Sequence, residues 1–279
     1  MKISKNLKKD SKNIMNNQHK PADVIRKKTN HKVTFIIILI TIIIYEILTD
    51  VLGILDNVLF PGFSKIIPKF KESLPMLLKS LLSSSLLLFP SYFIALFIGI
   101  FLGIIVGTRK QLYESLKPII FALNPVPPSM LTPYLIAIMP TFFISSSSVI
   151  FLGAFWPIFI STINGIRMVD RRYLESADML GYDKYKTLFY VVIPAASPMI
   201  LSGMGTALNF SFILLSIAEL FATTSGLGYF IQYYADFSDY ARVISGLIFT
   251  MIFIVIIMLM FDRFKKKVLF WTFSKKEVD

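Results

Sequence analysis

The sequence predicts an all-α integral membrane protein with about six transmembrane helices. Hydrophobic residues make up 55% of the 279 positions and the mean hydropathy is +0.67, which is too apolar for a soluble chain that must cover its own core. A helix needs about 20 predominantly apolar residues to span a bilayer. Windows of that kind lie at 34–54, 81–107, 118–139, 147–166, 195–218 and 243–261.

The placement of the basic residues predicts the orientation in the membrane. The net charge is +12, and a basic membrane protein more often owes its excess to cytoplasmic segments than to nucleic-acid binding. If both termini are cytoplasmic, 24 of the 29 Lys and Arg residues fall in inner segments, and five remain outside. We therefore expect a multi-pass protein of the cell membrane with both termini in the cytoplasm and no nucleic-acid partner.

Three regions follow from this topology. Residues 1–33 are polar and rich in Lys and Asn, which predicts a basic cytoplasmic tail that can lie along anionic lipid. Residues 34–266 form the transmembrane domain with a cytoplasmic loop at 167–194, and residues 267–279 form a cytoplasmic C-terminal tail. The chain has no Cys and its two His lie in the basic tail, so we expect no metal site and no catalytic site.

The segment after the first span predicts an outer loop, 55–80, that carries a surface helix, because apolar residues recur there at roughly helical spacing among lysines. In the second span, Ala95, Gly99, Gly103 and Gly107 fall on every fourth position. A strip of small side chains lets another helix approach closely, so we expect this face to be a helix contact. The fifth span repeats the pattern with Gly203, Ala207 and Ser211.

The third span is interrupted by prolines between Asn124 and Pro133. Backbone groups that lose their partners are tolerated at membrane depth only inside protein or beside a watery cavity. A kinked packing helix would explain the prolines equally well. As one hypothesis, the translocation path is lined here by Asn124 and Ser129, together with Asn209 and the carboxylate Glu219 of the fifth span.

A short polar insert, Asp170 to Pro194, separates the fourth and fifth spans. Asp170 is placed to cap a helix that starts at Arg171, and Gly181 to end it in the left-handed conformation. Asp183 is the expected N-cap of a second short helix, Lys184 to Val192, which Pro194 ends because it lacks the N–H of a continuing helix.

The insert resembles the loop by which permeases of ATP-binding-cassette (ABC) importers dock onto their ATPase. Its residues follow the spacing E-A-A-x-x-x-G-x9-I-x-L-P, with Ser for the second Ala, Val for Ile and Ile for Leu; the matching positions are Glu175, Ser176, Ala177, Gly181, Val191, Ile193 and Pro194. Other stretches look like permeases of the nitrate, sulfonate and taurine importer group: Pro125–Pro128, Trp156-Pro157, Asn164–Arg167, Ala218-Glu219, Thr224–Tyr229 and Asp262-Arg263. The segment Met139–Ser148 departs from the glycine-bearing turn of that group.

This resemblance implies a binding-protein-dependent transport inner-membrane component with the type I ABC importer (MetI-like) permease fold. It implies a non-catalytic subunit, since the chain has no phosphate-binding G-x-x-x-x-G-K-[ST], so that ATP and Mg are bound by partner ATPase subunits. The other implied partners are a second permease copy and an extracytoplasmic substrate-binding protein. The ATPase-docking residues implied are Tyr173, Glu175, Ser176, Ala177, Leu180, Gly181 and Pro194.

The family imports sulfonate-, taurine- or nitrate-like anions and also neutral thiamine-precursor- or riboflavin-like compounds, and the sequence does not select among them. Two other functions stay open. An ion-gradient-driven secondary transporter would need charged or paired polar groups at mid-membrane, where Asn209 is almost the only deep polar candidate. A membrane assembly or signalling protein without transport has only the basic tail in its favour.

Overall fold

The computed structural model describes residues 31–271, and over that range the chain consists of helices, turns and loops without a strand. This confirms the predicted all-α class. The chain separates into two compact units, residues 1–54 and 55–279. In the described part of the first unit, helix α2 (His31–Glu46) continues into a π-helical turn (Ile47–Val51), and the two cover most of the first predicted span.

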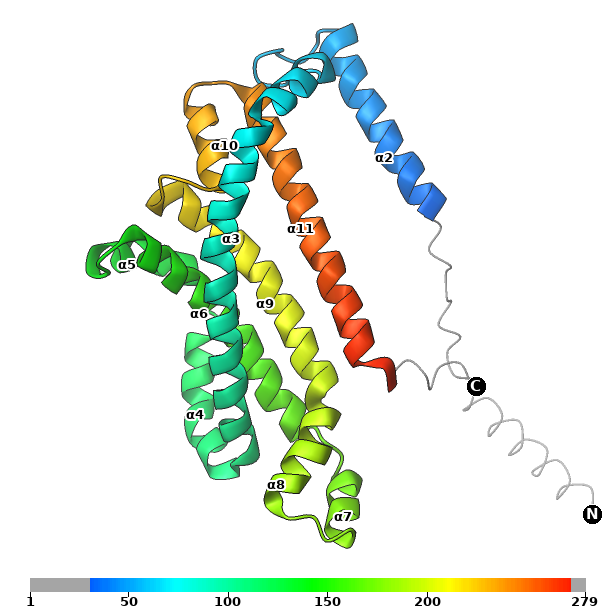
Figure 1. Ribbon diagram of the computed structural model, residues 1–279, viewed down its shortest axis with the longest axis vertical. Coiled ribbons are helices and arrows are strands. Elements are labelled where there is room, and N and C mark those ends of the chain that lie inside the picture. Colours follow the sequence, from blue (N-terminus) through cyan, green and yellow to red (C-terminus); the bar gives the residue numbers. More distant parts are fainter. Residues whose placement is uncertain (1–30, 272–279) are drawn as a thin grey trace, which may run out of the picture. The chain divides into compact units, whose positions relative to one another are not determined.

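The second unit holds the remaining helices (Figure 1). They are α3 (Phe63–Thr108), α4 (Lys110–Leu123), α5 (Thr132–Ile138), α6 (Phe142–Arg167), α7 (Arg171–Met179), α8 (Lys184–Thr187), α9 (Ile193–Ala222), α10 (Leu227–Asp236) and α11 (Tyr240–Val268). A 3₁₀ helix (Pro128–Leu131) precedes α5, and a π-helical turn (Leu188–Val192) joins α8 to α9. Within this unit, α7 and α8 lie at one end of the long helices and α10 lies at the other (Figure 1).

Four stretches of the described chain are long and apolar enough to cross a membrane: α3, α6, Lys184–Leu220 and α11. A fifth candidate is the pair formed by α4 and Pro128–Ile138, whose axes meet at 75°. The predicted windows from 81–107 onward therefore each fall on one of these elements. The first window falls on α2, which has 16 residues, and the turn after it.

Helix α3 differs from the prediction of a separate surface helix followed by a second span. It runs unbroken for 46 residues and carries three prolines inside. The physical reason lies in its first half, where Ile66 and Leu77 are almost completely buried and Leu77 packs on Leu227 and Phe230 of α10. This packing sustains a helix in a lysine-bearing segment whose exposed face looks polar in the sequence.

The strips of small residues are helix contacts, as predicted. A Cβ on Gly103 would lie 2.6 Å from Thr162 Cβ of α6, and a Cβ on Gly203 of α9 would lie 2.3 Å from Ser161 Cβ. The backbones of α3, α6 and α9 thus approach too closely for larger side chains. The main apolar core forms where these three helices meet, with Leu88, Ile150 and Ile158 fully buried there.

The third predicted span is broken where the prolines predict it. Helix α4 ends at Leu123, a turn follows, and the chain resumes as the 3₁₀ helix at Pro128 and then as α5. The prolines remove donors that a continuous helix would need, so the two halves diverge rather than stack.

Candidate functional site

The first helix of the insert, α7, begins at a side-chain cap. The carboxylate of Asp170 accepts a hydrogen bond from the Arg172 backbone N–H at 2.9 Å. The Arg172 guanidinium also donates to Asp170 Oδ2 at 2.6 Å, and these bonds lower the pKa of Asp170 to about 2. The cap therefore remains ionised at any physiological pH.

The same helix ends in a Schellman turn. The Tyr182 N–H donates to the carbonyl of Ala177 at 3.0 Å, and the Gly181 N–H donates to the carbonyl of Asp178 at 3.0 Å. Gly181 has φ +70°, the left-handed conformation in which a side chain is strained, although no atom lies within 4 Å of where its Cβ would be. The turn, rather than packing, requires glycine here.

The second helix of the insert begins as predicted but does not end as predicted. Asp183 accepts from the Lys186 N–H at 2.7 Å and starts α8. Pro194 does not terminate the helix: α8 passes through the π-helical turn directly into α9, in which Pro194 occupies the first turn. A proline ring clashes with the carbonyl four residues before it in a regular α-helix, and the wider π turn at that point accommodates it.

A groove of about 640 Å³ opens between α7 and the start of α9. Five of the seven predicted docking residues line it together: Tyr173, Ser176, Ala177, Leu180 and Pro194. Ala177 is buried, whereas Leu180 is 70% exposed. The neighbouring Tyr190, which also lines the groove, is 72% exposed. Large apolar side chains gathered in this way are typical of a protein–protein contact.

The two other predicted docking residues support this surface from outside the groove. Gly181 ends α7, and Glu175 pairs with Arg171 at 3.0 Å on the exposed side of the helix. The predicted docking set missed the other lining residues, which include the aromatic side chains Tyr190 and Trp271. Tyr190 adjoins the recognised spacing and could have been found there, but no local signal links Trp271 to a helix about 100 residues earlier.

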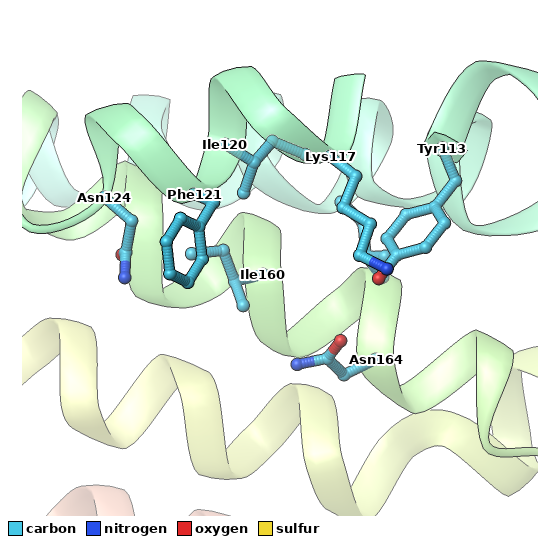
Figure 2. Close-up of a pocket in the computed structure, with 8 residues that line it drawn as sticks. Tyr113, Lys117, Ile120, Phe121, Asn124, Ile160 and Asn164 are labelled. Carbon is cyan, nitrogen blue, oxygen red and sulfur yellow. The ribbon is translucent and has the colours of Figure 1, made fainter. Parts of the chain in front are cut away.

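The four predicted path residues do not share one cavity. Asn124 lines a cavity of about 210 Å³ between α4 and α6 (Figure 2). Ser129 is half-buried in the 3₁₀ helix. Asn209 is exposed on α9, on the same face as the exposed Ser202 and Thr206. Polar side chains on the outer face of a membrane helix are costly against lipid, so this stripe favours a water-filled path or a second chain.

Glu219 is almost completely buried near the end of α9. Its Oε1 accepts from the Ser84 hydroxyl at 2.5 Å and its Oε2 from the Gly228 N–H at 2.7 Å, while Ser84 Oγ accepts from the Leu227 N–H at 2.9 Å. The carboxylate thus lies at the N-terminus of α10, where the helix dipole favours negative charge. It ties α3, α9 and α10 together.

Glycine is required beside this carboxylate. Gly226 has φ +122°, and a Cβ there would lie 2.2 Å from Glu219 Oε1. A Cβ on Gly228 would lie 2.9 Å from the Cβ of Glu219. The glycines of the segment 224–229 therefore let the start of α10 close over the carboxylate.

The described residues contain no group of three or more His, Cys, Asp or Glu that could hold a metal ion.

Comparison with known proteins gives one family and a set of transport proteins. Residues 95–270 match the family described as binding-protein-dependent transport system inner membrane component. The chain is 37% identical over 140 residues to the putative aliphatic sulfonates transport permease protein SsuC of Bacillus subtilis, which covers 50% of each chain. It is 33% identical over 159 residues to the nitrate import permease protein NrtB of Synechocystis, covering 57% of this chain and 56% of that one.

A third relative is the taurine transport system permease protein TauC of Escherichia coli, 32% identical over 132 residues, with 47% of this chain and 48% of that one covered. The chain spans about half the length of the curated relatives it matches. A solved structure of the MetNI methionine ABC transporter in an inward-facing conformation matches with a TM-score of 0.61 at 18% identity, covering 71% of this chain and 98% of that one. At this identity the likeness shows the fold, which is the predicted MetI-like one.

Proposed function

The chain belongs to the binding-protein-dependent transport system inner membrane component family, and from this premise we propose that it is the permease subunit of an ABC importer. The family and the apolar helices make it a multi-pass membrane protein. In the proposed complex it forms the solute path with a second copy of itself and is coupled to separate ATPase subunits. An extracytoplasmic binding protein delivers the solute.

The observation that carries this proposal is the insert at 170–194. Its two helices are fixed by their own caps. Leu174, Leu188 and Val192 pack against the core, whereas Leu180 and Tyr190 line an open groove. A partner that seats an aromatic or aliphatic side chain there would bury Leu180 and Tyr190. We assign the ATPase to this surface and place the insert, the basic tail at 1–33 and the C-terminal tail at 267–279 in the cytoplasm.

ATP hydrolysis and nucleotide and Mg binding belong, in this proposal, to the partner alone. ATP-driven closure of the two ATPase subunits would move the seated helices and, through them, the long helices between two packings. The cargo is a small solute: the named relatives are described as permeases for sulfonates, nitrate and taurine, which makes a small solute with an oxyanion group the first candidate.

The docking assignment is tested with Gly181→Val. A β-branched side chain at φ +70° costs about 1–2 kcal/mol of local strain and distorts the end of α7. We co-express the full-length chain with the ATPase subunit of its transporter and measure the ATPase retained on the purified permease and its hydrolysis rate. The expected result is a loss of at least tenfold in retained ATPase.

Gly53→Val is the matched control. Gly53 also has positive φ, +57°, with nothing within 4 Å of a Cβ, and it lies outside the insert. It should retain the ATPase at the level of the unchanged chain. If the Gly181→Val and Gly53→Val variants retained equal amounts of ATPase, the docking assignment would be wrong.

The path assignment rests on Asn124, Ser129 and the exposed stripe of α9 that contains Asn209. We propose that Glu219 acts at the end of this path by holding the turn between α9 and α10. Asn209→Leu removes a polar group from the stripe without touching the insert. Uptake by the reconstituted complex should fall severalfold while the ATPase stays bound. Unchanged uptake would show that the exposed stripe of α9 does not line the path.

A further inference from the structure

The polar side chains that line the cavity between α4 and α6 include a cation and no acid. Tyr113, Lys117 and Asn124 reach it from α4 and its C-terminal end, and Asn164 reaches it from α6 (Figure 2). Ile120 and Ile160 are among its apolar walls. No carboxylate lines the cavity, so its polar lining consists of an ammonium group, two amides and a phenol.

The polar groups of this cavity have unused donors. Within residues 31–271, the side chains of Lys117, Asn124 and Asn164 make no hydrogen bond and no ion pair. An ammonium offers three donors and no acceptor, and each amide offers two further donors. Such a set is complementary to a group with several acceptor oxygens and a negative charge.

The acid one turn before Lys117 on α4 pairs with another cation. Glu114, one turn earlier on α4, pairs with Arg167 at 3.7 Å. The Arg167 guanidinium also lies 3.8 Å from the centre of the Tyr113 ring, which fixes that ring at the cavity edge. Arg167 lies against the Tyr113 ring and Lys117 lines the same cavity, so two cations accompany one carboxylate, Glu114. The region around the cavity therefore keeps a net positive charge.

We propose that this cavity binds the oxyanion group of a small solute, with Lys117 as its charge partner and Asn124 and Asn164 as neutral donors. The proposal rests on the proposed transport function and narrows the cargo to a small anion, because the ammonium group of the exposed Lys117 is the one charged group in the lining and attracts a negatively charged solute. A volume of about 210 Å³ suits a solute of few atoms. The phosphate of an anionic phospholipid has the same chemistry and is the other possible source of the group.

The test uses the full-length permease with its ATPase in nanodiscs of zwitterionic phosphatidylcholine, titrated calorimetrically with methanesulfonate. Dimethyl sulfone, which has the same shape without the charge, is the neutral control. Methanesulfonate should bind and dimethyl sulfone should not. Lys117→Gln should weaken methanesulfonate binding at least tenfold, and Lys117→Arg should restore most of it.

Lys110→Gln is the matched control variant, because Lys110 lies on the same helix but does not line the cavity. It should leave the affinity unchanged. A second arm purifies each variant from membranes that contain phosphatidylglycerol and measures the retained lipid by mass spectrometry. Retention that depends on Lys117, without methanesulfonate binding, would identify the lipid phosphate as the oxyanion.

If Lys117→Gln changes neither methanesulfonate binding nor lipid retention, the oxyanion site is overturned. Retained ATPase is measured in the same preparations. A Lys117→Gln complex that keeps its ATPase shows that such a failure concerns this site alone, whereas an unchanged chain that cannot hold the ATPase would instead count against the proposed function.

Discussion

The two ends of the stretch Lys184–Leu220 use polar groups in opposite ways. At the α7–α8 end the carboxylates of Asp170 and Asp183 bond to backbone groups two or three residues away. Asp183 is exposed and Asp170 half-buried, and apolar side chains surround an open groove. At the α10 end the carboxylate of Glu219 is buried and bonds to Ser84, 135 residues away. One end is open for a partner, and the other is closed on its own chain.

The two ends are expected on opposite sides of the membrane, and this can be tested first. The chain has no Cys, so Ser176→Cys in α7 and Ser225→Cys before α10 each introduce a single thiol at an exposed position. With an impermeant thiol reagent on intact cells, we expect labelling of the thiol at 225 and none at 176 until the membrane is opened. Labelling of both from outside would contradict the topology.

The next effect is on stability. Glu219→Ala leaves the Ser84 hydroxyl and the Gly228 N–H buried without their acceptor, which we expect to lower the free energy of unfolding by about 2–4 kcal/mol. Glu175→Ala is the counterpart at the other end, where an exposed ion pair contributes about 0.5 kcal/mol or less. Both are measured by unfolding the full chain in mixed micelles, and similar losses would show that the ends do not differ as described.

A smaller contrast separates Gly181 and Gly226, the positive-φ glycines at the two ends. Gly181→Ala meets no neighbour and should cost about 1 kcal/mol from backbone strain alone. Gly226→Ala adds a contact of 2.2 Å with Glu219 Oε1 and should cost clearly more, because the carboxylate cannot move without losing its donors. The same unfolding measurement compares them, and a larger loss from Gly181→Ala would reverse the interpretation of the two turns.

The sequence could predict what is decided locally. Features that depend on a continuous stretch of chain were predicted correctly. They are the apolar windows, the small-residue strips, the caps at Asp170 and Asp183 and the left-handed Gly181. Five docking residues share a groove because one short helix and the return of the chain to Pro194 bring them together.

The sequence could not predict contacts that only the packed chain creates. Nothing near Ser84 indicates that it will bond to Glu219, and nothing near Trp271 indicates the groove. The unbroken course of α3 depends on burial against α10, and the course of the chain through Pro194 depends on a π turn that no residue pattern marks. In the sequence, nothing distinguishes Lys117 from the other lysines predicted to be cytoplasmic. Its role in a cavity becomes visible only when α6 brings Asn164 to the same cavity.

The continuous course from α8 into α9 also has a mechanical consequence. Lys184–Leu220 has 37 residues, so it behaves as a rod of about 55 Å without a loop in it. A tilt of about 10° around the middle of such a rod would displace each tip by about 5 Å in opposite directions. A displacement at the Tyr190 end would therefore be accompanied by an opposite displacement at Glu219. Because Glu219 is hydrogen-bonded to α3 and α10, its displacement would move those helices as well.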